Sequence, residues 1–394
     1  MNLDWNQLAV KGGRILFFVI DGVGDLPNQE NKTPLTEAKT PYLDSISKKS
    51  VMGMHLPIGE GITPGSEMAH MALFGFDPIK YATGRGVFEA LGLGFDLIPG
   101  DLAVRGNLAF FKDGEVLDRR AGRIKTREAI KILNKISNID IEGCKAILIP
   151  GKGHRFSVVF RGDGLNGPLP GNDSGKTGVC PRFPTVKSDL RRSRLVMSAW
   201  TQFANEIIKN EKKANGVLLR GADVLRPVQT MERKHLITCK AIANYPCYIG
   251  VGKYLGMNAK IYPNDADSRI REAASSKEDF VFFHYKDTDA AGEDGNFKKK
   301  TLCVEEADSI LRRIMEESNF DVLVVTGDHC TPCCYKGHSW HRVPLLVYGG
   351  RARGDGIPRF SEEEARKGSI GSIYAKEIMP IVLAHASRLK TYLT

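Results

Sequence analysis

Acidic and imidazole side chains follow short apolar runs at several places in this 394-residue chain. A carboxylate binds hard divalent cations, and an imidazole extends the choice to Mn²⁺, Zn²⁺ and Co²⁺. A strand-end carboxylate can also cap the next helix, so a single one is weak evidence for a metal. Several together predict a metal site, whose candidate ligands are Asp21, Ser66, Asp289, Glu293, Asp328, His329 and His338.

Ser66 stands in the stretch ITPGSEMAHM, where a Thr-Pro-Gly turn precedes an apolar pattern typical of a helix. A serine at the start of a helix commonly caps the free backbone amides. The same place suits a nucleophile for an anionic phosphoryl group, because the N-terminus of a helix carries partial positive charge. Two nearby divalent cations would clamp that group and lower the pKa of the serine hydroxyl. We expect Ser66 to be both cap and nucleophile.

The elements that must position these residues are buried strands alternating with helices. Apolar runs at Ile15–Ile20, 280–283, 322–325 and 343–349 predict strands, and residues 301–318 have the 3.6-residue period of a helix. This alternation predicts an α/β domain with a mostly parallel sheet. Functional side chains of such sheets gather at the carboxyl ends of the strands, so we expect the candidate ligands to converge there.

The middle of the chain has another pattern. Residues 99–124 alternate in polarity as antiparallel strands do, residues 162–178 form a long Gly/Pro-rich loop typical of a lid, and residues 193–216 predict an amphipathic helix. We therefore expect two domains, one formed by residues 1–80 with 225–394 and a smaller inserted α+β domain formed by residues 81–224.

The net charge of +10 is concentrated in the middle of the chain, where residues 81–225 hold 24 Lys and Arg against 15 Asp and Glu. Such a balance fits nucleic acid or a small anionic substrate. No aromatic residues are interleaved at a stacking spacing, so we favour the small anion and expect no nucleic-acid partner. The lysines 298–300 are expected to be solvated charges.

The sequence has no apolar run of eighteen residues and no export signal, which indicates a cytoplasmic protein without a membrane segment. Its eight cysteines lack the spacing of a disulfide framework, so we interpret them as reduced thiols.

Several motifs together resemble a known family. VIDGVGD, TPGSEMAHMALFGFDP, TGRGVFEALGLG, LDRRAGRI, DTDAAGEDG and TGDHCTP…KGHSWHRVPLLVYG are similar, in order and over nearly the whole chain, to archaeal-type cofactor-independent (2,3-bisphosphoglycerate-independent) phosphoglycerate mutase. The resemblance implies the alkaline phosphatase superfamily, a mostly parallel sheet flanked by helices, and an inserted smaller domain. It also implies interconversion of 3-phosphoglycerate and 2-phosphoglycerate.

The resemblance further implies two divalent metal ions and no 2,3-bisphosphoglycerate. Ser66 matches the serine that becomes phosphorylated, and with Asp21, Asp328 and His329 it matches the ligands of one metal. The other metal would be bound by Asp289, Glu293 and His338. The family has histidine where this chain has Glu293, a harder donor, so we expect Mn²⁺ first, with Mg²⁺, Co²⁺ and Zn²⁺ as alternatives.

A phosphoglycerate carries a phosphate and a carboxylate, both of which suit bidentate guanidinium groups. Asp118 is expected to shuttle the substrate's hydroxyl proton, domain closure is expected to exclude water, and a homo-oligomer is an option. Two alternatives stay open: another phosphomutase or phosphomonoesterase of the superfamily, and a metal-poor binding protein, suggested by Glu293. The candidate substrate-binding residues are Arg85, Arg119, Arg120, Arg123, His154, Arg155 and Arg220.

Overall fold

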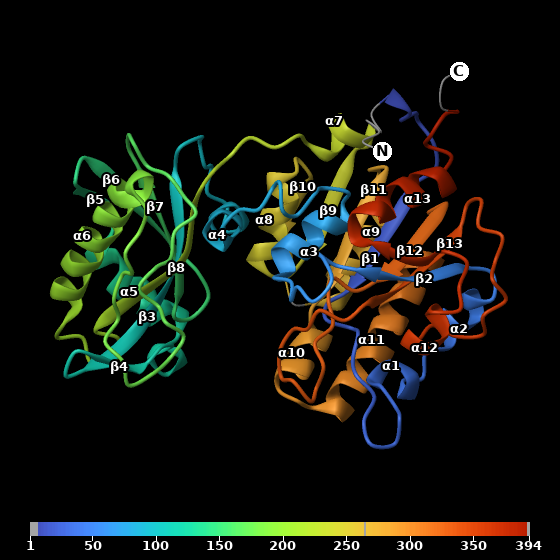
Figure 1. The fold of residues 1–394 in the computed structure, drawn as a ribbon, viewed down its shortest axis with the longest axis horizontal. Coiled ribbons are helices and arrows are strands. Elements are labelled where there is room, and N and C mark those ends of the chain that lie inside the picture. Colours follow the sequence, from blue (N-terminus) through green and yellow to red (C-terminus); the bar gives the residue numbers. More distant parts are fainter. Residues whose placement is uncertain (1–6, 264, 392–394) are drawn as a thin grey trace. The chain divides into compact units, whose positions relative to one another are not determined.

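A computed structural model describes residues 7–263 and 265–391. The chain forms two compact units, each shown as a ribbon in Figure 1. The larger unit is formed by the chain up to Ala82 and from Gln229 onward, and the inserted unit by Thr83–Val228. In the part of the chain that is described, no helix has the length and apolar character needed to cross a membrane.

The larger unit is built on one eight-stranded sheet with the strand order β10-β9-β11-β1-β12-β13-β2-β14. The pairs from β10 to β12 are all parallel, as is the pair β2–β14. The strands are β1 (Ile15–Ile20), β2 (Val51–Leu56), β9 (Cys239–Ala243), β10 (Asn258–Ile261), β11 (Phe280–Tyr285), β12 (Val322–Thr326), β13 (Val343–Gly349) and β14 (Gly371–Tyr374). The mostly parallel sheet predicted from the apolar runs is confirmed.

One of the predicted strands runs against the others. β13 is antiparallel to both of its neighbours, β12 and β2. A parallel return needs a crossover of a dozen or more residues, usually a helix. The connection from β12 to β13 contains no helix and instead carries His329 and His338, so the chain returns antiparallel.

The register of the central strands aligns their carboxyl ends. β1 is fully buried and pairs with β11 on one side and β12 on the other. Ile20 lies opposite Tyr285, and Val19 lies opposite both His284 and Thr326. The residues that follow these three strands therefore meet at one edge of the sheet.

Helices cover the sheet of the larger unit (Figure 1). The longest, α11, buries Val304, Ala307 and Leu311 in the same core as β1, as its helical period predicted. The helices of this unit are α1 (Pro34–Glu37), α2 (Pro41–Ser47), α3 (Ser66–Leu73), α7 (Met231–His235), α8 (Pro246–Tyr254), α9 (Ala266–Ser275), α10 (Asp287–Glu293), α11 (Phe297–Glu316), α12 (Glu362–Ala365) and α13 (Ile378–His385).

Lys300, one of the lysines expected to be solvated, is fully buried on α11. Its ammonium lies 2.9 Å from a carboxylate oxygen of Asp25 and donates to the carbonyl oxygens of Gly24 at 3.0 Å and Thr331 at 2.9 Å. The expectation was wrong for this lysine, because the charge run gave no sign of a buried carboxylate supplied by a distant loop.

The inserted unit has its own antiparallel sheet, with the order β4-β3-β7-β6-β5. β8 also pairs with β3, on the side opposite β7. Its elements are α4 (Arg85–Gly92), β3 (Leu102–Lys112), β4 (Glu115–Asp118), α5 (Thr126–Leu133), β5 (Ile139–Ile141), β6 (Cys144–Pro150), β7 (Arg155–Arg161), α6 (Arg191–Ile208) and β8 (Gly216–Val224). The Gly/Pro-rich segment 162–178 contains no helix and no strand, apart from an isolated bridge at Leu169.

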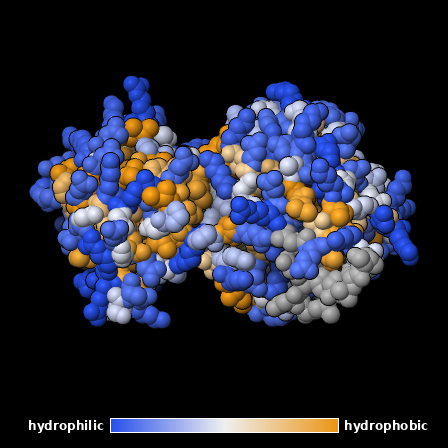
Figure 2. All heavy atoms as spheres, turned by 90° about the horizontal axis from the view of Figure 1, so that it is seen from above, coloured by the Kyte–Doolittle hydropathy of each residue, from blue (hydrophilic) through white to orange (hydrophobic). Residues whose placement is uncertain are grey.

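A separate hydrophobic core holds the inserted unit together. Trp200 of α6 is fully buried and packs edge-on against Phe160 of β7, with ring centroids 5.9 Å apart. On the face shown in Figure 2, hydrophobic residues lie interspersed with hydrophilic ones on both units. This mixture is ordinary for protein surfaces, more than half of whose accessible area comes from apolar atoms.

Candidate active site and metal centre

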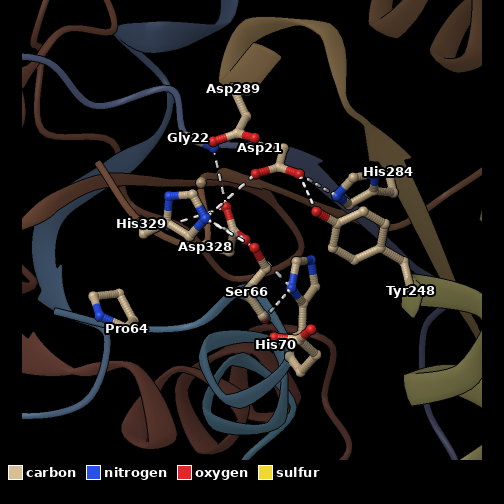
Figure 3. Close-up of polar contacts among 12 residues, drawn as sticks. Asp21, Gly22, Pro64, Ser66, His70, Tyr248, His284, Asp289, Asp328 and His329 are labelled. Carbon is tan, nitrogen blue, oxygen red and sulfur yellow. Dashed lines mark hydrogen bonds and ion pairs between the residues drawn. The ribbon is translucent and has the colours of Figure 1, made fainter. Parts of the chain in front are cut away.

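The end of β1 delivers Asp21 into the interior of the larger unit, where its side chain is fully buried (Figure 3). The next residue, Gly22, has a φ of 61°. A Cβ atom there would collide with the hydroxyl of Thr331 and with Asp289, so glycine allows the two later segments to approach Asp21. The Gly22 amide also donates to Asp328 at 3.0 Å.

Asp328 and His329 follow β12 and lie beside Asp21. The Nε2 atom of His329 is 3.2 Å from Oδ2 of Asp328 and 3.5 Å from Oδ1 of Asp21. The same Nε2 lies 3.1 Å from the Oγ of Ser66. Four candidate ligands from three distant segments thus converge on one point (Figure 3).

Ser66 is the first residue of α3, and Gly65 occupies the capping position without a side-chain hydrogen bond. The expectation that Ser66 caps the helix was therefore wrong. Ser66 is only 4% exposed, and its hydroxyl is directed to His329. Freed from the backbone, the hydroxyl sits at the positive end of an eight-residue helix.

A second group is formed by Asp289, His329 and His338, with His329 shared between the two groups. Asp289 lies on α10 and its Oδ1 is 3.5 Å from Nε2 of His338. The rings of His329 and His338 stack with centroids 3.7 Å apart. Within each group the ligand atoms lie within 4.8 Å of one another.

Glu293 is in neither group. It ends α10 and is exposed, four residues after the buried Asp289. Its ligand role therefore stays a prediction that no contact of the described residues supports.

The hydrogen bonds around the two histidines suit metal coordination. Nδ1 of His338 donates to the Pro64 carbonyl at 3.0 Å, which leaves the lone pair on Nε2. Thr331 donates its hydroxyl to Asp289 at 2.7 Å, so its oxygen accepts from Nδ1 of His329 at 3.1 Å. In the neutral form of each ring the lone pair therefore lies on Nε2, the atom that would bind a metal.

The carboxylates support the same conclusion. Oδ1 of Asp21 and Oδ2 of Asp328 are buried and have no hydrogen-bond partner among the described residues. A buried anionic oxygen without a donor is costly, and a cation offsets that cost. The donor set of carboxylate oxygens, imidazole nitrogens and one hydroxyl therefore fits divalent cations of the Mn²⁺ and Zn²⁺ type.

Electrostatics divide the acids of the site. Burial would raise the pKa of Asp21, but Lys286 and His284 hold it well below the usual range. Burial and the neighbouring Asp21 raise the pKa of Asp328 well above the usual value. Burial and His338 lower the pKa of His329 to about 3, so its imidazole is neutral.

Sequence reasoning missed several residues of this centre. Lys286 bonds both Asp21, at 2.9 Å, and Asp289. Tyr248 and His284 also contact Asp21. A signal for His284 and Lys286 was their position just before Asp289 in the sequence. Tyr248 lies on a helix without any polar motif, so no local pattern pointed to it.

In the inserted unit, β3 brings several predicted substrate-binding residues together. Arg105, which the sequence analysis missed, is buried opposite Arg220 of β8, and Asn107 lies opposite Arg155 of β7. Burial and then Arg105 lower the pKa of Arg220 to about 10, with Arg85 and Arg119 adding to the shift.

The remaining predicted residues of this unit lie around the same strands. Burial, Arg155 and Arg120 lower the pKa of His154 to about 4. Arg119 makes a bidentate pair with Asp173 of the Gly/Pro-rich segment, at 2.9 and 2.8 Å. Arg123 is exposed.

Asp118 has both carboxylate oxygens engaged by the backbone. Oδ1 accepts from the Arg120 amide at 2.7 Å and Oδ2 from the Gly122 amide at 2.6 Å. These bonds shape the turn after β4. The expected proton shuttle stays a prediction, since the carboxylate already has a structural partner on each oxygen.

Comparison with known proteins places this chain among relatives. A profile of the Metalloenzyme superfamily matches residues 13–385. A probable 2,3-bisphosphoglycerate-independent phosphoglycerate mutase of Thermosipho africanus is 40% identical over 384 residues, covering 96% of this chain and 95% of the relative. One of Aquifex aeolicus, with the same name, is 41% identical over 405 residues, covering 98% of each chain.

Solved structures agree with the sequence matches. A protein from Pyrococcus horikoshii has a TM-score of 0.84 at 27% identity, covering 98% of this chain and all of that one. A cofactor-independent phosphoglycerate mutase from Thermoplasma acidophilum has a TM-score of 0.69 at 28% identity, covering 95% of this chain and all of that one. The chain thus belongs to the Metalloenzyme superfamily and, within it, to the 2,3-bisphosphoglycerate-independent phosphoglycerate mutases.

Proposed function

We propose that this protein interconverts 3-phosphoglycerate and 2-phosphoglycerate through a phosphoserine at Ser66. The observation that carries the proposal is the position of the Ser66 hydroxyl. It lies at the start of α3, does not cap the helix, and is 3.1 Å from Nε2 of His329. Amides at a helix N-terminus stabilise the oxygens of a phosphoryl group. Membership of the phosphoglycerate mutase family supports the substrate.

We further propose two divalent cations, with Mn²⁺ as the preferred ion. Asp21, Ser66, Asp328 and His329 would hold one, and Asp289 and His338 the other. When bound, such cations neutralise phosphoryl charge and lower the pKa of the attacking hydroxyl. Without a cation, Nε2 of the neutral His329 accepts a hydrogen bond from the Ser66 hydroxyl at 3.1 Å, so both atoms are already close enough to be ligands of one ion.

The arginines of the inserted unit are proposed to bind the carboxylate and to retain glycerate between the two transfers. A guanidinium binds a carboxylate through two parallel hydrogen bonds, which fixes its orientation. Arg119 already makes such a pair with Asp173, so it would bind the substrate through the guanidinium N–H groups that this pair does not use. Retention of glycerate would favour return of the phosphoryl group over its loss to water.

The test is an assay with 3-phosphoglycerate and Mn²⁺, in which both 2-phosphoglycerate and free phosphate are measured. Wild type is expected to form 2-phosphoglycerate, and Ser66→Ala is expected to lose at least about 1,000-fold in kcat because the nucleophile is gone. Ser45→Ala, an exposed serine of α2, is the matched control and should keep full activity.

The products decide between the alternatives. Free phosphate as the sole product would identify a phosphomonoesterase and overturn the mutase proposal. A wild-type protein without any turnover would support the metal-poor binding protein. Ser66→Ala with wild-type activity would exclude the phosphoserine route.

A further inference from the structure

Three buried aromatic rings pack together behind the candidate metal ligands. They are His70 of α3, Tyr248 of α8 and His284 of β11, none more than 1% exposed. The rings of Tyr248 and His284 stack at 3.7 Å, and the ring of His70 lies 5.0 Å from the former and 5.3 Å from the latter. We call these three residues the ring cluster.

The ring cluster touches Asp21 on one oxygen only. The Tyr248 hydroxyl donates to Oδ2 at 2.5 Å, and Nε2 of His284 lies 3.2 Å from the same atom (Figure 3). Lys286 adds a further donor to Oδ2 at 2.9 Å. Oδ1 has no hydrogen-bond partner among the described residues and faces His329.

His70 links the ring cluster to the rest of the ligand set. Its Nδ1 donates to the carbonyl of Ser66 at 2.7 Å and lies 3.5 Å from Oδ2 of Asp328. Its ring meets Phe282 edge-on at 5.3 Å, on the side of β11. The ring cluster therefore contacts the backbone of Ser66 and the carboxylates of Asp21 and Asp328.

We propose that Tyr248, held in place by His70 and His284, is a positioning residue that binds one oxygen of Asp21 and so reserves the other for a divalent cation. The inference rests on the metal site proposed above and adds a determinant of its geometry. The Tyr248 hydroxyl is suited to the task because its buried ring stacks on His284 and contacts the ring of His70, which fixes the position of the donor.

Two further observations support this assignment. The Tyr248 hydroxyl is the donor of this bond, because a carboxylate oxygen can only accept. Residues that hold a metal ligand by a hydrogen bond commonly change metal affinity 10–100-fold when they are replaced. The bond to Asp21 also gives the buried Tyr248 hydroxyl the acceptor that a buried phenol requires.

The test compares Tyr248→Phe with Tyr285→Phe. Tyr285 is also buried in the larger unit, and its hydroxyl donates to Glu306 at 2.7 Å, away from the metal groups. Both variants lose one tyrosine–carboxylate hydrogen bond and keep the ring; the bond of Tyr248 is buried and that of Tyr285 is partly buried. Titration calorimetry of the metal-free full-length protein with Mn²⁺ measures affinity, and infrared spectroscopy measures the carboxylate stretching bands of the bound state.

We expect Tyr248→Phe to bind Mn²⁺ about 10-fold more weakly. Its carboxylate bands should move away from the pattern of a ligand that binds through one oxygen. Tyr285→Phe should keep wild-type affinity and bands.

Equal Mn²⁺ affinity in Tyr248→Phe and wild type would overturn the inference, and so would an equal loss in Tyr285→Phe. A Tyr248→Phe protein that unfolds at a much lower temperature than Tyr285→Phe without metal, yet binds Mn²⁺ as wild type does, would make the hydroxyl a determinant of stability only and also overturn the inference. A wild type that binds no Mn²⁺ would instead refute the metal site itself, and the positioning role with it.

Discussion

At the scale of single residues, buried negative charge dominates the site. The carboxylates of Asp21, Asp289 and Asp328 lie together with at most 1% exposure each. Carboxylates buried close together raise one another's pKa, which opposes ionisation unless cations accompany them. Lys286 supplies one positive charge to Asp21 and Asp289. Divalent cations would supply the rest.

Asp289 and Glu293 stand four residues apart on α10 and allow a direct comparison. Asp289→Ala is expected to weaken Mn²⁺ binding at least about 100-fold, because a buried ligand is lost. Glu293→Ala should change it less than about threefold, since Glu293 is exposed. Calorimetric titration with Mn²⁺ measures both. A large loss in Glu293→Ala would show that this side chain reaches the metal.

At the scale of elements, hydrogen bonds and a buried ion pair connect the loop after β12 to α11. Asp25 accepts from the Cys333 amide at 3.2 Å, while Lys300 binds both Asp25 and the Thr331 carbonyl. The loop carries His329 and His338, so the buried ion pair of Lys300 and Asp25 anchors the segment that holds both candidate ligands. Rigid support of this kind keeps ligands in place without contact to the metal.

Lys300→Met is expected to lower the free energy of unfolding by about 3–5 kcal/mol, because Asp25 would be left as a buried, unpaired charge. Lys299→Met is the matched control, since Lys299 is the exposed neighbour on the same helix, and its effect should stay within about 0.5 kcal/mol. Urea unfolding monitored by fluorescence and circular dichroism measures both. Similar losses in the two variants would contradict the role given to Lys300.

At the scale of the whole molecule, the chain divides into two units with separate hydrophobic cores. All candidate metal ligands lie in the larger unit, and all candidate substrate arginines lie in the inserted unit. Units with separate cores can unfold in separate steps. Each kind of ligand should therefore stabilise its own unit.

Mn²⁺ is expected to raise the unfolding temperature of the larger unit alone. At a concentration of about 100 times Kd, binding adds about 2.7 kcal/mol of stability, which corresponds to roughly 5–10 °C for a unit of this size. Differential scanning calorimetry with and without a chelator should show one transition that moves and one that stays. An equal shift of both transitions would contradict a metal site confined to the larger unit.

The sequence by itself determined the mostly parallel sheet, the long helix α11, the family and the candidate ligands of the proposed metal centre. These follow from local information: apolar runs set the strands, a 3.6-residue period sets the helix, and motifs keep their order along the chain. Asp21, Asp328 and His329 could be proposed together because parallel strands end at one edge of a sheet. The arginines were proposed on other grounds, from the positive charge of the middle segment and the two anionic groups of a phosphoglycerate.

Only the tertiary structure decided the direction of β13, the burial of Lys300, the exposure of Glu293 and the release of Ser66 from capping. Each depends on partners far away in the sequence, which a local pattern does not contain. Tyr248 is the clearest example, since it lies 227 residues from Asp21 on a helix without polar motif. Its role follows from close packing and from the need of a buried carboxylate for a donor.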